Sequence, residues 1–351
     1  MRAQRAFESL DKGKAMPFRN KTVLITGGTG SFGRAAAKKL LLEKLCAKVI
    51  IFSRDEWKQW DMQQSDPIFD HPNIRYFLGD IRDSGRLARA FNGVDIVIHA
   101  AALKQVPAAE YNPTEFIKTN VLGAMNIIDN AIDRGVQKVI ALSTDKSVNP
   151  INLYGATKLC ADKLFIAANS YVGVKGFPIF SVVRYGNVLG SRGSLIPLWK
   201  KMIAEGVTAL PVTDKRMTRF WISIDESVNF VIDKINMMHG GEIYVPKIPS
   251  IKILDLAKAM APKLPIEIIG IREGEKLHEL LVSQEEARFA AELKDAFVIL
   301  PPVFKSEFSQ RLAKLHEKGV LVPPNFSYGS NNNPEWIEGD EIRKMLKKHG
   351  F

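Results

Sequence analysis

The stretch Lys21-Thr-Val-Leu-Ile-Thr26-Gly-Gly-Thr-Gly-Ser-Phe-Gly33 determines the fold expected for this chain. Its first six residues form a short β-branched apolar run, which is typical of a buried strand. Glycines then interrupt the run, and residues 34–44 have the apolar spacing of a helix. Glycines at such a turn let the backbone approach a pyrophosphate, and the helix N-terminus offers N–H groups to the anion. The stretch therefore predicts a dinucleotide-binding βαβ unit.

The alternation of apolar runs and helical patterns continues as far as residue 185. Strands are expected at 49–53, 74–78, 94–102, 138–142 and 180–185, and helices at 83–91, 113–134 and 154–171. This rhythm is typical of parallel strands with crossover helices, and nearly continuous apolar strands fit a sheet covered on both faces. We expect an α/β fold built on a doubly wound parallel Rossmann sheet.

The rhythm changes after Asn187, where a polar loop and shorter α/β pieces follow. We therefore expect a smaller, interleaved C-terminal α/β substrate domain. The expected division is a flexible lead-in (1–15), a dinucleotide-binding Rossmann domain (16–189, completed by 220–245), a substrate-binding domain (190–219 and 246–302) and a C-terminal tail (303–351) that closes in a helix from Glu338.

The bulk composition narrows the class of protein. The 351 residues carry a formal net charge of +11, which suits an anionic ligand. The Lys and Arg residues are scattered, however, and no basic run is interleaved with aromatics, so we expect no nucleic-acid partner. No apolar run approaches the ~20 residues needed to span a bilayer, and neither cysteine has metal-ligand spacing. We expect a cytoplasmic protein with no membrane partner and no metal.

The predicted cofactor site combines the glycine loop with the ends of neighbouring strands. Asp80 and Ile81 follow the third strand, where Asp80 is placed to bind adenine or to cap the next helix. Ala100 and Ala101 follow the fourth strand, and their small side chains let a cofactor lie against the backbone. The loop residues expected to contact the cofactor are Gly27, Thr29, Gly30, Ser31, Phe32 and Gly33.

The end of the second strand bears on the choice of cofactor. An acidic residue there favours a free ribose 2′-hydroxyl, whereas an Arg accommodates a 2′-phosphate. Ser53-Arg54-Asp55 contains both types. Arg54, with Lys58 one turn further on, favours NADP, and NAD is the alternative.

A second informative stretch, Ser143 to Lys158, follows an apolar strand and opens a helix. Tyr154 and Lys158 are four residues apart, so they share a helix face. A nearby ammonium lowers the pKa of a phenol, which would make Tyr154 a usable base. With the glycine loop, this Tyr-x-x-x-Lys pair resembles the short-chain dehydrogenase/reductase superfamily, and the chain length resembles its extended, sugar-nucleotide-modifying branch.

Thr144-Asp145-Lys146 refines the resemblance. Hexose 4,6-dehydratases of this branch typically carry Thr-Asp-Glu here, whereas Thr-Asp-Lys with the Tyr retained resembles the inverting UDP-N-acetylglucosamine 4,6-dehydratases of pseudaminic-acid-type pathways. The resemblance extends from about residue 16 to the end. Its motifs include Ser53-Arg-Asp-Glu56, His99-Ala-Ala-Ala-Leu-Lys-Gln-Val-Pro107, Arg184-Tyr-Gly-Asn-Val-Leu-Gly-Ser191, Met217-Thr-Arg-Phe-Trp221 and Arg272-Glu-Gly-Glu-Lys-Leu-His-Glu279.

The resemblance implies a reaction and roles for these residues. Tyr154, helped by Lys158 and Thr144, takes the 4-OH proton while hydride leaves C4 for the nicotinamide; that pair also contacts the cofactor. Lys146 removes the C5 proton, and Asp145 protonates the departing 6-OH. Lys146 must then be partly neutral, and we expect burial and the charge of Lys158 to lower its pKa.

The resemblance implies a UDP-sugar substrate. It also implies a homo-oligomer built from dimers, such as a hexamer. Arg side chains suit bidentate phosphate contacts, and Glu275 could hold a ribose diol. The expected substrate-binding residues are Lys104, Asn187, Arg192, Arg219, Arg272 and Glu275. His99 is expected to be a packed core histidine.

Three other readings stay open at this point. A C4 epimerase on the same substrate would not need Asp145 and Lys146. A bifunctional dehydratase/5-epimerase is so close that the residues do not separate it from the dehydratase. A non-catalytic NADP-binding protein on the same fold is a more remote alternative, since a fold does not fix a function.

Overall fold

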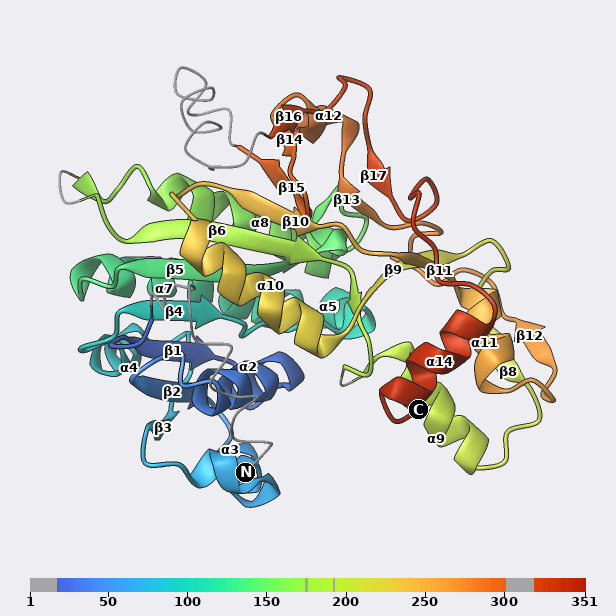
Figure 1. Ribbon diagram of the computed structural model, residues 1–351, viewed down its shortest axis with the longest axis horizontal. Coiled ribbons are helices and arrows are strands. Elements are labelled where there is room, and N and C mark those ends of the chain that lie inside the picture. Colours follow the sequence, from blue (N-terminus) through green and yellow to red (C-terminus); the bar gives the residue numbers. More distant parts are fainter. Residues whose placement is uncertain (1–17, 174–175, 192, 301–318) are drawn as a thin grey trace, which may run out of the picture.

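The computed structural model describes residues 18–173, 176–191, 193–300 and 319–351, and its centre is the expected α/β sheet (Figure 1). The strand order is β16-β14-β15-β10-β6-β5-β4-β1-β2-β3. Strands β1 to β6 and β10 pair in parallel, whereas β15, β14 and β16 add antiparallel pairings at one edge. The chain order reverses between β1 and β4, which is the switch point at which open α/β sheets bind ligands.

The strands of the main sheet are short and largely apolar, as expected of strands covered on both faces. They are β1 (Thr22–Thr26), β2 (Lys48–Ser53), β3 (Ile74–Leu78), β4 (Ile96–His99), β5 (Lys138–Thr144), β6 (Ile179–Tyr185), β10 (Ile243–Pro246), β14 (Ala290–Glu292), β15 (Ala296–Ile299) and β16 (Val320–Leu321).

Helices cover both faces of this sheet. Helices α2 and α10 pack together on one face, and α4, α7 and α8 on the other (Figure 1). The helix predicted at 113–134 changes its winding through a π-helical segment, η2 (Ile117–Leu122). The other helical elements are α2 (Ser31–Leu42), α3 (Glu56–Ser65), η1 (Pro67–Asp70), α4 (Ser84–Ala90), α5 (Val106–Tyr111), α6 (Pro113–Phe116), α7 (Gly123–Asp133), η3 (Asp145–Ser147), α8 (Leu153–Ala168) and α10 (Ile224–Met237).

A smaller lobe has its own hydrophobic core, in which Trp199, Leu256 and Ile342 are buried. Its sheets have the orders β11-β9-β7 and β12-β8, and a further pair, β13-β17, lies beside the main sheet. The elements of the small lobe are β7 (Asn187–Val188), α9 (Leu195–Ala204), β8 (Leu210–Val212), β9 (Thr218–Ile222), β11 (Ser250–Lys252), α11 (Ile253–Met260), β12 (Ile266–Ile268) and α14 (Asp340–Lys348). Beside the main sheet lie β13 (Leu280–Val282), α12 (Gln284–Ala287) and β17 (Tyr328–Gly329).

The chain crosses between the two lobes more often than the domain boundaries expected from the sequence imply. Helix α10 and strand β10 complete the main sheet, but β9 lies in the small one. Residues 290–299, grouped above with the second domain, extend the main sheet because every residue of β15 is apolar and buried. The C-terminal helix packs Ile342 and Leu346 into the small core. The predicted lead-in (1–15) and residues 303–318 of the tail lie outside the described residues.

Candidate active site

The carboxyl ends of four central strands meet at one edge of the main sheet. Thr26 is level with His99, and Thr144 is level with Tyr185. The glycine loop after β1, the alanines after β4 and the polar loop after β5 therefore lie side by side. His99 itself is buried against the Thr26 hydroxyl at 2.8 Å, as expected of a core histidine, and burial lowers its pKa to about 3.

The glycine loop forms a close-packed cradle that only glycine permits. Gly27 has φ +66°, and a Cβ there would lie 2.9 Å from Ala101 Cα. A Cβ on Gly33 would lie 2.5 Å from Gly28 Cα. Helix α2 begins after Gly30 without a side-chain cap, so its N-terminus suits an anion. The loop, which also holds Thr29, Ser31 and Phe32, and the Ala100-Ala101 backbone therefore fit a dinucleotide pyrophosphate.

The residues expected near the adenosine follow β2 and β3. Asp55 caps α3 and pairs with Lys58 at 2.8 Å, so both are engaged with each other. Asp80 pairs with Arg82 at 2.8 Å, while Arg54, half exposed, lies 3.8 Å from Asp80. The cap of α4 is Asp83, so Asp80 is not the helix cap. Ile81 lies against helix α7, where a Cβ on Gly123 would meet it at 2.7 Å.

The loop after β5 is fastened to the start of α8. Asp145 is fully buried and accepts hydrogen bonds from Thr144 Oγ1 at 3.0 Å and Lys146 Nζ at 2.9 Å. Asn152 caps α8 through the Gly155 amide at 2.8 Å. A Cβ on Gly155 would lie 2.1 Å from the Lys146 carbonyl oxygen. The helix therefore fixes the backbone position of the loop.

Tyr154 and Lys158 are both buried on α8, but their interaction differs from the expected one. Lys158 Nζ donates to the Leu142 carbonyl oxygen at 2.7 Å. Burial raises the pKa of Tyr154 to about 12, and the Lys146 charge and a hydrogen bond to Thr144 offset this only in part. The expectation of a lowered phenol pKa is therefore wrong for this structure, and the main opposing cation is Lys146.

Lys146 is held between two carboxylates. Its Nζ lies 2.9 Å from Asp145 Oδ1 and 3.2 Å from Glu279 Oε1. Burial favours the neutral amine, but the two carboxylates outweigh burial and raise the Lys146 pKa. The expected lowering of that pKa is thus wrong, because sequence proximity to Lys158 did not reveal Glu279. Lys146 is an ammonium in this arrangement.

The pKa values of Asp145 and Glu279 are shifted in opposite directions. Burial and the negative charge of Glu279 raise the pKa of Asp145, against the pull of Lys146 and Thr144. Burial would also raise the pKa of Glu279, but Lys146, Arg219 and Lys276 together lower it. Two titratable neighbours with opposite shifts are the usual signature of an acid and its ionised partner. Asp145 is therefore the member of the pair that more readily keeps its proton.

Sequence reasoning gave no role to Glu279 or to Asp162. Glu279 was only the last residue of a family motif, far in sequence from Lys146. Asp162 is buried and accepts hydrogen bonds from Ser143 at 2.7 Å and Ser147 at 3.1 Å. These bonds hold the loop after β5 against helix α8. Its signal was spacing, since it lies four residues after Lys158 on the same helix face.

The residues expected to bind substrate divide into two groups. Lys104, whose pKa is lowered by partial desolvation and by the charge of Lys146, lies on the active-site side. Asn187, on β7, is level with Trp221 on β9. Arg219 is buried, and its guanidinium donates to the carbonyl oxygens of Thr218, Lys276 and Leu277. The expected phosphate contact does not fit an Arg219 so fully engaged by the protein.

Glu275 pairs with Arg219 at 3.4 Å, and Arg272 lies three residues before it in the same loop. Arg192 lies outside the described residues. Three carboxylate oxygens around the site, Asp145 Oδ2, Glu275 Oε2 and Glu279 Oε2, are buried without a hydrogen-bond partner in the described structure. Buried polar atoms normally have partners, so these oxygens are candidates to accept hydroxyls of a bound sugar or ribose.

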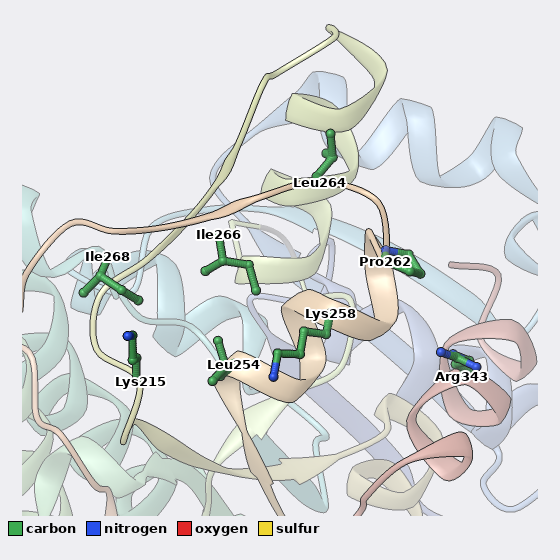
Figure 2. A pocket seen from close by; sticks show the side chains of 8 residues that line it. All are labelled: Lys215, Leu254, Lys258, Pro262, Leu264, Ile266, Ile268 and Arg343. Atoms are coloured by element: carbon green, nitrogen blue, oxygen red, sulfur yellow. The ribbon is translucent and has the colours of Figure 1, made fainter.

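A hollow of about 620 Å³ lies apart from this site, in the small lobe (Figure 2). Five apolar and three cationic side chains line it: Lys215, Leu254, Lys258, Pro262, Leu264, Ile266, Ile268 and Arg343. In the described ranges, no cluster of three or more potential metal ligands is present. No helix within the same ranges has the length and apolar character needed to cross a bilayer.

The switch-point glycine cradle and the buried Tyr154/Lys158 pair define a dinucleotide-dependent enzyme of the short-chain dehydrogenase/reductase class. A family model described as "Polysaccharide biosynthesis protein" matches residues 23–301. An inverting UDP-N-acetylglucosamine 4,6-dehydratase from Campylobacter jejuni is 53% identical over 94% of this chain and 98% of its own. A UDP-glucose 4-epimerase from Rickettsia massiliae is 45% identical over 94% of this chain and 96% of its own.

Solved structures agree with this class. Pen from Bacillus thuringiensis superposes with a TM-score of 0.84 at 36% identity, covering 95% of this chain and 99% of its own. DesIV, a dTDP-glucose 4,6-dehydratase from Streptomyces venezuelae with NAD bound, gives a TM-score of 0.65 at 25% identity, covering 73% and 86%. The chain belongs to the polysaccharide biosynthesis protein family, in the branch of the inverting UDP-N-acetylglucosamine 4,6-dehydratases.

Proposed function

We propose that this protein catalyses NADP-dependent 4,6-dehydration of UDP-N-acetylglucosamine with inversion at C5. The product is a UDP-2-acetamido-2,6-dideoxy-hexos-4-ulose. The observation that carries the proposal is the cluster beside Tyr154 in which the partly exposed Lys146 lies between the buried carboxyl groups of Asp145 and Glu279. Oxidation at C4 requires only a Tyr/Lys pair and a hydroxyl, whereas loss of the 6-OH requires a second acid and base near C5 and C6.

The proton inventory of this reaction matches the groups in the site. A nicotinamide held by the glycine loop and the Ala100-Ala101 backbone would supply the hydride chemistry that links C4 and C6. Two protons leave the sugar: the 4-OH proton goes to Tyr154, which must act as the phenolate, and the C5 proton goes to Lys146, which must act as the neutral amine. Two are consumed: Asp145 gives one to the departing 6-OH, and water gives one to C5 from the opposite face, which inverts that centre, while the proton on Tyr154 passes to water. The raised pKa of Asp145 suits a donor to the leaving hydroxyl.

Substrate binding is assigned to the loops around this cluster. Glu275 has a buried oxygen without a partner, which suits a ribose diol. Lys104, Asn187 and Arg272 are proposed to contact the diphosphate or the sugar, and Arg219 acts as the buried counter-charge of Glu275 and Glu279.

We further propose NADP as the cofactor, since Asp55 is engaged with Lys58 and Arg54 is half exposed. A homo-oligomer is also proposed, because Tyr111, Ile117, Leu122 and Met125 expose apolar surface along the helical stretch from α5 to α7. Light scattering would measure the mass of the particle in solution. The mass of a single chain at micromolar concentration would contradict the proposed homo-oligomer.

One incubation tests the proposed reaction. The protein with UDP-N-acetylglucosamine in deuterated water should give a product that has lost one water, carries deuterium at C5 and has the inverted C5 configuration. The 4-epimerase is the second candidate, since relatives of that name are 45% identical to this chain. An epimerase would give a product of unchanged composition, and that outcome would replace the present proposal.

A further inference from the structure

Glu279 has no counterpart in the proton inventory above, yet it lies at the centre of the active-site charges. Its side chain is 2% exposed, and Oε1 lies 3.2 Å from Lys146 Nζ. The backbone of Glu279 is held by two hydrogen bonds. Its N–H donates to Ser330 Oγ at 2.9 Å, and its carbonyl oxygen accepts from the Ser330 amide at 2.8 Å. A carboxylate fixed at both ends of its backbone unit is well placed to exchange a proton with Lys146.

The proposed function leaves Lys146 with a difficulty that Glu279 can resolve. An ammonium cannot remove a proton from C5, and Lys146 is an ammonium beside the ionised carboxylate of Glu279. Asp145 cannot relieve it, since Asp145 must keep its proton for the departing 6-OH. The remaining neighbour with an open acceptor is Glu279, whose Oε2 is buried and has no hydrogen-bond partner in the described structure.

We propose that Glu279 is the positioning residue that takes a proton from Lys146 and thereby frees its amine to act on C5. This inference rests on the proposed dehydratase function. The N–H bond of the Lys146 ammonium breaks, an O–H bond forms on Glu279, and both groups become neutral. The amine then takes the C5 proton and is an ammonium again. Glu279 passes its proton to the Asp145 carboxylate left after water departs, which restores the starting state.

The surrounding charges determine how this transfer depends on pH. Three cations face Glu279, namely Lys146, Arg219 and Lys276, and they favour its ionised form. Asp145 faces it from the loop after β5 and favours the protonated form. Lys104 and Tyr154 also interact electrostatically with Lys146. A sugar that covers Lys146 removes water from the pair, and desolvation favours the neutral amine and acid over two charges.

The test separates proton transfer from a purely structural role. Glu279→Gln keeps the shape and a hydrogen-bond acceptor for Lys146 but cannot take its proton. We expect C4 oxidation, followed as reduced nicotinamide, and KM to stay within about threefold of the unsubstituted enzyme. Deuterium entry at C5 and water loss should fall about 100-fold. The residual dehydration rate of Glu279→Gln should rise with pH, because hydroxide then removes the Lys146 proton. Glu279→Asp should recover part of the dehydration rate at neutral pH.

The controls give each outcome a meaning. Glu242→Gln alters another buried carboxylate, one that binds Ser181 and the Gly240 amide away from the site, and it should leave the pH profile of folded protein unchanged. If Glu279→Gln lowers C4 oxidation and C5 exchange equally, or leaves the pH profile as before, the inference is wrong. If the unsubstituted enzyme yields no dehydrated product, the proposed function fails first, and the two failures are distinct.

Discussion

Lys158 Nζ lies 2.7 Å from the carbonyl oxygen of Leu142, near the end of β5. The ammonium of the Tyr-x-x-x-Lys pair is thereby tied to the strand that carries Thr144 and Asp145. Burial lowers the Lys158 pKa, and the carboxylate of Asp162 opposes this shift. Lys158 thus connects helix α8 to the end of strand β5, and the carboxylate of Asp162 balances its charge.

Lys158→Met should lose both the tether and the charge. The Leu142 carbonyl oxygen loses a charged donor, so we expect the free energy of unfolding to fall by about 1–3 kcal/mol. Turnover should fall about 100-fold. Lys163→Met is the matched control, because Lys163 is exposed on the same helix. Urea unfolding and steady-state kinetics measure the two effects, and equal behaviour of both variants would contradict the assignment.

Asp145→Asn should separate oxidation from water loss. The amide cannot protonate the departing 6-OH, so dehydration should fall about 100-fold. C4 oxidation uses Tyr154 and should continue, so reduced nicotinamide should accumulate and unreacted substrate should gain deuterium at C5. Stopped-flow absorbance and mass spectra follow both. Dehydration within twofold of the unsubstituted rate would show that another group protonates the 6-OH.

Arg54→Ala should weaken NADP binding without changing NAD binding. Hydrogen bonds to charged groups contribute about 1.5–3 kcal/mol, so we expect an increase in the NADP dissociation constant of roughly 10- to 100-fold. Lys58→Ala should have a smaller effect, because Lys58 already pairs with Asp55. Calorimetric titration of cofactor-free protein gives the constants. Tighter binding of NAD than of NADP by the unsubstituted protein would reverse the cofactor proposal.

Gly155→Ala should damage the active-site loop directly. The added Cβ would lie 2.1 Å from the Lys146 carbonyl oxygen, and overpacking of this kind costs about 1–3 kcal/mol. Gly85→Ala, also in the first turn of a helix, is the control, since its Cβ would meet no atom closer than 3.5 Å. The midpoint temperature of thermal unfolding and the turnover rate should both fall for Gly155→Ala, and neither should fall for Gly85→Ala. Normal turnover of that variant would mean that the loop can shift without losing function.

His99 should make stability depend on pH. Its folded pKa is lowered from 6.5 to about 3 by burial and by the Lys158 charge. Between these values the unfolded chain binds a proton that the folded chain does not, so stability falls as pH falls, by up to about 1.4 kcal/mol per pH unit. His99→Asn should remove this part of the slope, and His71→Gln should not. Urea unfolding at several pH values checks the difference, and parallel slopes for all three proteins would refute it.

Local patterns were enough to predict most of the main sheet. The glycine loop, the apolar strands and the helical spacing each act within about twenty residues, and they placed β1 to β6 with helices α2, α4, α7 and α8. Helix α3 was missed because its apolar residues do not form one buried face: Trp57 is 66% exposed and Trp60 50%. Strands β14 and β15 are too short to signal which sheet they join.

The site was predictable where one segment carries it, and less so where two segments meet. Asp145, Lys146, Tyr154 and Lys158 were placed together because they lie within one strand-to-helix turn. The pKa directions of Lys146 and Tyr154 were wrong because they depend on burial and on Glu279, which a different loop supplies. Arg219 was assigned to phosphate because its three carbonyl partners cannot be seen in a sequence.

The separation of Lys146 and Glu279 along the chain has a consequence for biosynthesis. The ribosome completes the glycine loop, Tyr154 and Lys146 well before it reaches Glu279. A nascent chain at that stage lacks the carboxylate that lies beside Lys146 in the finished fold. The charge environment of Lys146 is therefore complete only after the segment that carries Glu279 has been synthesised and has packed against the loop after β5.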